Sequence, residues 1–100
     1  MRGFDRQLQD LLAKNPEAAV EYTRLFAELP LTTQLAIMRR QRKLSQRAMA
    51  KKIRLPQPHV ARAETASHNP RLSTIVKLAK ALRCHVVLVP DEKLARLTAA

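Results

Sequence analysis

Side chains that donate hydrogen bonds recur at short intervals between Leu44 and Thr65. They are Gln46, Arg47, Lys51, Lys52, Arg54, Gln57, His59 and Arg62. Arginine and lysine bind phosphates, and the glutamine amide and the arginine guanidinium also match the edges of base pairs. These residue types at this spacing predict a surface that contacts both the backbone and the bases of a nucleic acid.

The chain offers little for catalysis. Its three histidines are not spaced as metal ligands, and Glu64 is the only acid in residues 31–90. Paired carboxylates are therefore lacking there, and no glycine-rich phosphate loop or nucleophile elbow is present. Cys84 is the only cysteine, which argues against a disulfide or a zinc site and favours a buried, inert thiol. We expect no enzymatic activity, no catalytic residues, no metal and no cofactor.

Two short helices joined by a tight turn would position the donor side chains. The first would begin after Ser45 as N-cap, and the second near Gln57. The side chains expected in the core are Ala48, Met49 and Ile53 from the first helix and Val60 and Ala63 from the second. Residues 54–56 leave room only for a sharp corner. This arrangement predicts a helix-turn-helix in which the second helix reads the bases.

Charge is concentrated on the same part of the chain. Residues 1–30 hold four Lys/Arg against five Asp/Glu, residues 31–90 hold thirteen against one, and residues 91–100 hold two against two. So basic a segment implies a polyanionic partner, with nucleic acid ahead of an anionic membrane or an acidic protein. Membrane binding is disfavoured because the basic helices lack an aromatic face.

Further helices are indicated on both sides of this motif. A first helix is expected over residues 4–14, with Phe4, Leu8, Leu11 and Leu12 as its apolar stripe, and a second from the N-cap Asn15 to about Glu28. A third should run from Thr32 or Thr33 as N-cap to about Lys43 and bury Leu35, Ala36 and Met38. After the helix-turn-helix, a helix capped by Ser73 should bury Ile75, Leu78, Ala79 and Leu82. We therefore expect an N-terminal helical extension over residues 1–30 and a DNA-binding domain over residues 31–84. The acidic extension serves either dimerisation and partner contact or the completion of the core.

The stretch His85–Pro90 has the composition of a strand. It contains four consecutive apolar residues, Val86, Val87, Leu88 and Val89, and ends at a proline. A lone strand needs a hydrogen-bonded neighbour. We therefore expect residues 85–100 to form a strand that pairs between two subunits, followed by a short tail.

The segment Leu35–Leu82 resembles the Cro and phage-repressor type of helix-turn-helix, the XRE family. The matching positions are Arg39, Leu44 to Gln46, Met49, Ala50, Ile53, Gln57, Val60, Glu64, Pro70 and Leu78 to Leu82. The resemblance implies an all-α, lambda-repressor-like bundle that binds double-stranded operator DNA. Arg54 and Ala66 stand where the family usually has glycine, which predicts strain at the corner.

The resemblance also assigns roles to individual residues. It implies base contacts from Gln57, His59 and Arg62, and a buried or half-buried ion pair between Arg39 and Glu64. The residues expected on phosphates are Gln46, Arg47, Lys51, Lys52, Arg54 and Arg71.

An acidic helical lead-in, one helix-turn-helix and a following strand look like the antitoxin of a HigBA-type toxin-antitoxin pair. That resemblance implies a cytoplasmic homodimer that represses its own operon and neutralises a small basic RelE-like toxin that cleaves RNA. Two alternatives remain open. One is a stand-alone repressor of the prophage type, and the other is an RNA-binding or adaptor protein.

Overall fold

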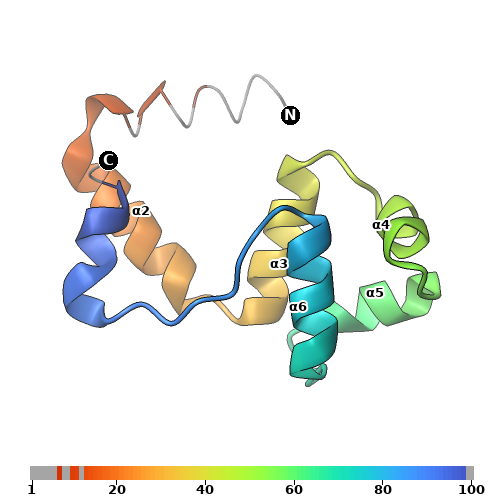
Figure 1. The fold of residues 1–100 in the computed structure, drawn as a ribbon. Helices are drawn as coiled ribbons and strands as arrows, with labels where there is room; N and C mark the ends of the chain where they lie inside the picture. Colours follow the sequence, from red (N-terminus) through yellow and green to blue (C-terminus); the bar gives the residue numbers. More distant parts are fainter. Residues whose placement is uncertain (1–6, 8–9, 12, 99–100) are drawn as a thin grey trace. The chain divides into compact units, whose positions relative to one another are not determined.

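The computed structural model describes residues 7, 10, 11 and 13–98, and this part of the chain is helical without strands (Figure 1). The elements are α2 (Pro16–Glu28), α3 (Leu31–Gln41), α4 (Gln46–Ile53), α5 (Gln57–Ala63), α6 (Leu72–Ala81) and the 3-10 helix η1 (Asp91–Thr98). The chain divides into two compact units. One is Pro30–Val87, and the other combines Met1–Leu29 with Leu88–Ala100.

Helices α3 to α6 enclose one apolar core in the first unit. Its buried members are Leu35, Met49, Ala50, Ile53, Val60, Ala63, Ile75, Leu78, Ala79 and Leu82. Met49 of α4 has 0% of its surface exposed, and Leu78 of α6 has 2%. Full burial of a side chain of this size contributes about 1.5–3 kcal/mol. This core holds α4 and α5 in place, as the helix-turn-helix prediction requires.

Helix α3 begins earlier than we predicted. Thr32 and Thr33 are not N-caps, because the helix begins at Leu31 directly after Pro30. The fixed φ of a proline, −53° at Pro30, suits the start of a helix without any side-chain cap. Thr32 is consequently buried inside the helix, whereas Met38, expected in the core, is only half-buried.

Helix α4 begins as the sequence predicts. The Oγ atom of Ser45 accepts a hydrogen bond of 2.9 Å from the backbone N–H of Ala48 and so caps the helix. Ala48 itself is exposed, so its predicted burial is wrong, and Ala50 is buried in its place. In a helix the residue before Met49 is turned about 100° away from it, and this rotation directs Ala48 to solvent.

Helix α6 buries Ile75, Leu78 and Ala79 as its periodicity predicts, and Leu82 is buried at the C-cap directly after it. The start of the helix differs from the prediction. Ser73 is the second residue of the helix and is exposed. Arg71 occupies the N-cap position and makes no capping hydrogen bond through its side chain. The predicted serine cap is therefore wrong, and tertiary packing of Ile75 and Leu78 sets the helix in place without it.

Three helices of this unit end at basic residues with left-handed backbone. Lys43 follows α3 with φ 61°, Arg54 follows α4 with φ 58°, and Arg83 follows α6 with φ 59°. Glycine usually takes such positions because a Cβ atom is unfavourable there. The expected strain at the corner is thus present, and Arg54 retains the left-handed turn between α4 and α5.

Replacing Arg54 by glycine should raise the free energy of unfolding by about 1 kcal/mol, because it relieves the left-handed backbone. The matched control is Arg47→Gly, which places glycine inside α4 and should lower that free energy by about 1 kcal/mol. Urea unfolding followed by circular dichroism measures both. A loss of stability on Arg54→Gly would show that the arginine side chain outweighs the strain.

Residues 84–90 form irregular coil where we predicted a strand. Val87 is 68% exposed and Leu88 is 100% exposed. The residues described include no strand to which this segment could add, and a run of apolar residues does not form a strand without a hydrogen-bonded neighbour. The prediction of a strand at Val86, Val87, Leu88 and Val89 is therefore wrong for this chain, and the pairing of that strand between subunits loses its support.

The second unit contains α2 and η1, which pack against each other. As predicted, Asn15 caps α2, and its Oδ1 accepts the N–H of Ala18 at 3.3 Å. The predicted helix over residues 4–14 lies mostly outside the described residues. Within that range the structure describes residues 7, 10, 11, 13 and 14, and these are helical.

On the exposed side of α2, Arg24 bonds to Glu21 and to Glu28, the latter at 2.8 Å. The hydrogen bond from Arg24 holds the pKa of Glu21 below its usual value. The stabilisation from this pair is therefore present above the ordinary glutamate pKa and is lost as the pH falls through the lowered one.

Candidate nucleic-acid interface

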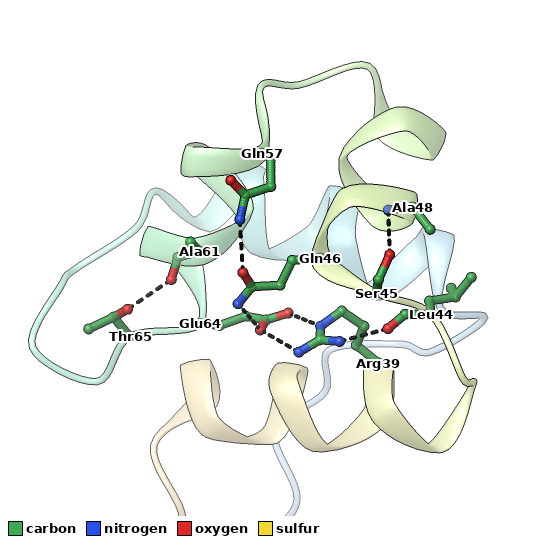
Figure 2. A network of polar contacts seen from close by, with 9 residues as sticks. All are labelled: Arg39, Leu44, Ser45, Gln46, Ala48, Gln57, Ala61, Glu64 and Thr65. Carbon is green, nitrogen blue, oxygen red and sulfur yellow. Dashed lines mark hydrogen bonds and ion pairs between the residues drawn. The ribbon is translucent and has the colours of Figure 1, made fainter.

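An ion pair joins the first helix of the bundle to the end of α5. The Nε and Nη2 atoms of Arg39 donate to the two carboxylate oxygens of Glu64 at 2.6 and 3.1 Å. Both side chains are buried, with 9% and 6% of their surface exposed. A third donor, Nη1 of Arg39, bonds to the carbonyl oxygen of Leu44 at 2.6 Å, just before α4 begins (Figure 2). The guanidinium thus joins α3, the start of α4 and the end of α5.

Two glutamines extend this network to the surface. The amide nitrogen of Gln46 donates to Oε1 of Glu64 at 3.0 Å, and the amide nitrogen of Gln57 donates to Oε1 of Gln46 at 3.0 Å (Figure 2). Each glutamine is the first residue of its helix. We assigned the two glutamines separately, to phosphate and to base, and did not predict their contact. Their matching places at the starts of α4 and α5 are the only sequence signal for it.

Helix α5 presents one face to the core and another to solvent. Val60 and Ala63 are buried, whereas Gln57, His59 and Arg62 are exposed. All three residues that we expect to contact bases are thus exposed on the same helix of seven residues. Pro58 lies in the first turn, where its missing N–H costs no helical hydrogen bond.

The comparison with protein-family models decides the family. Residues 35–89, more than half of the chain, match the model described as "Helix-turn-helix". The chain belongs to this helix-turn-helix family. Membership confirms the predicted XRE-type fold. The match covers α4 and α5 with the intervening corner, and also α6.

A curated relative matches the helix-turn-helix chain over 62 residues with 35% identity. It is an uncharacterized HTH-type transcriptional regulator, y4dL, of Sinorhizobium fredii. The matched segment covers 62% of this chain and 32% of the relative, so the chain spans about a third of that protein's length. No solved structure gave a significant match.

The side chains expected on phosphates surround the helix-turn-helix. Arg47, Lys51 and Lys52 project from α4, Arg54 lies at the corner, and Arg71 precedes α6. All five are exposed, and none has an ion-pair partner among the residues that the structure describes. Gln46, the sixth expected phosphate contact, is half-buried, but it has a second amide N–H beyond the one bonded to Glu64.

The described residues contain no group of three side chains suited to holding a metal ion. Within the same residues no helix is long and apolar enough to cross a membrane. Cys84, which we expected to be buried, is half-buried, and its thiol donates to the carbonyl oxygen of Leu82 at 3.5 Å.

Proposed function

We propose that this protein is a DNA-binding transcription regulator whose helix α5 reads base edges in the major groove. The proposal rests on the contrast between the buried face and the exposed face of α5. Its inner face is fixed in the core, while Gln57 and Arg62 are exposed on a helix flanked by exposed basic side chains. Glutamine pairs with adenine N6 and N7, and arginine with guanine O6 and N7.

The surrounding cations suit the DNA backbone. With thirteen Lys/Arg against one acid in residues 31–90, the domain attracts phosphates of any sequence. In this proposal Gln46, Arg47, Lys51, Lys52, Arg54 and Arg71 contact the backbone. Such contacts set the position and orientation of α5 and leave discrimination between sequences to its side chains.

Loss of Arg62 should separate base reading from backbone binding. The full chain first selects double-stranded sequences from a random pool, and affinities are then measured on the selected site and on random DNA. Arg62→Ala should cost about 1–3 kcal/mol on the selected site and relax its base preference, because a bidentate contact is lost. The control Lys52→Ala should weaken both DNAs alike.

Equal losses on both DNAs for Arg62→Ala would remove that residue from base reading. Failure of the unchanged protein to bind any double-stranded DNA would refute the proposed function and favour an RNA-binding or adaptor role.

A homodimer is the expected form on DNA, because one reading helix of seven residues contacts only a few base pairs. Two copies would read half-sites about one helical turn apart. A symmetric selected sequence bound by two chains supports this form. A single half-site bound by one chain contradicts it.

An antitoxin role is the narrower proposal, and a stand-alone repressor fits the family equally well. The antitoxin role draws on α2, whose exposed side holds three acids, Glu17, Glu21 and Glu28, against the one arginine, Arg24, that bonds to Glu21 and Glu28. Co-expression with the neighbouring gene separates the two proposals. A stable complex that also retards promoter DNA favours the antitoxin, and a neighbour that does not bind favours the stand-alone repressor.

A further inference from the structure

We propose that Glu64 is a specificity-determining residue, because it fixes which end of the Gln57 amide faces the DNA. It acts through Gln46 and touches no base itself. This inference rests on the proposed function, since it concerns the bases that Gln57 reads. It starts from the chain of hydrogen bonds that runs from Arg39 through Glu64 and Gln46 to Gln57 (Figure 2).

The direction of this chain follows from the chemistry of a carboxylate. Both oxygens of Glu64 accept from the guanidinium of Arg39, at 2.6 and 3.1 Å, so neither is placed to donate a hydrogen bond to Gln46. An ionised carboxylate accepts hydrogen bonds and cannot donate them. Gln46 must therefore turn its NH₂ group toward Glu64, 3.0 Å away, and its oxygen toward Gln57.

The same reasoning orients Gln57. The oxygen of Gln46 only accepts, so Gln57 must turn its own NH₂ group toward it, at 3.0 Å. One N–H of Gln57 is used in this bond. The second N–H and the Oε1 atom remain for a ligand.

A free N–H beside a free oxygen matches adenine. Adenine presents an acceptor at N7 and a donor at N6 in the major groove, whereas guanine presents acceptors at both N7 and O6. In the reverse orientation, the oxygen of Gln57 would accept a hydrogen bond from Gln46. The NH₂ group of Gln57 would then face the DNA with N–H donors. The buried ion pair therefore selects for adenine through two intervening amides.

Glu64→Gln tests the direction of the chain while preserving the shape of the side chain. The new amide would keep its oxygen on Nε of Arg39 and turn its NH₂ group toward Gln46, which loses the bond from Nη2 of Arg39 and reverses both glutamines. Selection from random double-stranded DNA should then show a base change at the position read by Gln57, which is the position whose preference Gln57→Ala abolishes. The adenine preference should fall at least about fivefold, with a shift toward guanine or thymine.

Two further variants separate direction from stability. Arg39→Lys keeps a cation beside an ionised Glu64, so it should weaken the fold but leave the adenine preference unchanged. Gln46→Ala keeps the ion pair and removes the link, so it should relax the adenine preference without a shift to another base. Gln46→Ala also carries the test if Glu64→Gln fails to fold, as judged by circular dichroism.

The outcomes distinguish this inference from the proposed function. If the unchanged protein selects no DNA sequence, the proposed function fails and the inference fails with it. If the protein selects a site and Gln57→Ala alters one position of it, the proposed function stands. Retention of the full adenine preference there by folded Glu64→Gln or Gln46→Ala overturns the inference, as does a preference of the unchanged protein for a base other than adenine.

Discussion

Replacing Glu64 by alanine should lower the free energy of unfolding by about 3–5 kcal/mol, the usual cost of removing one partner of a buried ion pair. The guanidinium of Arg39, with its side chain 9% exposed, would keep only the carbonyl of Leu44 as a partner. Domains of this size have a total stability of about 5–15 kcal/mol. The variant should therefore lose a large share of the stability of the domain.

The matched control is the double variant Arg39→Met with Glu64→Leu, which replaces both charges by apolar side chains. It should be about as stable as the original chain, because neither charge is then left unpaired in the core. Urea unfolding followed by circular dichroism measures both proteins. If the double variant is as unstable as Glu64→Ala, the loss does not come from an uncompensated charge.

Met49→Ala should lower the free energy of unfolding by about 2–5 kcal/mol, the range for deleting a large buried side chain. Met49 has no exposed surface and lies in the core cluster with residues of α5 and α6. Its loss leaves a cavity beside α5, so DNA affinity should fall with stability if this helix reads DNA as proposed.

Val76→Ala provides the control, because Val76 is 46% exposed on α6. Its effect should stay within about 0.5 kcal/mol. Thermal and urea unfolding measure both variants. A cost below 1 kcal/mol for Met49→Ala would mean that the bundle collapses around the gap, and the proposed dependence of α5 on this core would fail.

Local signals predicted several of the helices well. Ser45 and Asn15 have the side chains that cap helices, and both do so. The apolar spacing of α6 identified its buried face, because the period of a helix is set by the backbone. The starts of α3 at Leu31 and of α6 at Leu72 were not predicted, because neither helix uses a capping side chain.

The prediction of a strand at residues 85–90 was wrong for a physical reason. Strand formation depends on a hydrogen-bonded neighbour, and an apolar run carries no information about whether one exists.

The candidate site was predictable only in part. Individual donors could be named from the sequence, but the bonds from Gln46 to Glu64 and to Gln57 link residues 18 and 11 positions apart and required the fold.

The brevity of α5 makes this helix depend on the rest of the bundle. A helix of seven residues does not persist alone in water, so α5 exists only while Val60 and Ala63 are packed in the bundle. Opening of the bundle therefore erases the reading surface and exposes the chain to proteases in the same event. If α5 reads DNA as proposed, release from DNA and susceptibility to degradation are two readouts of one local unfolding equilibrium.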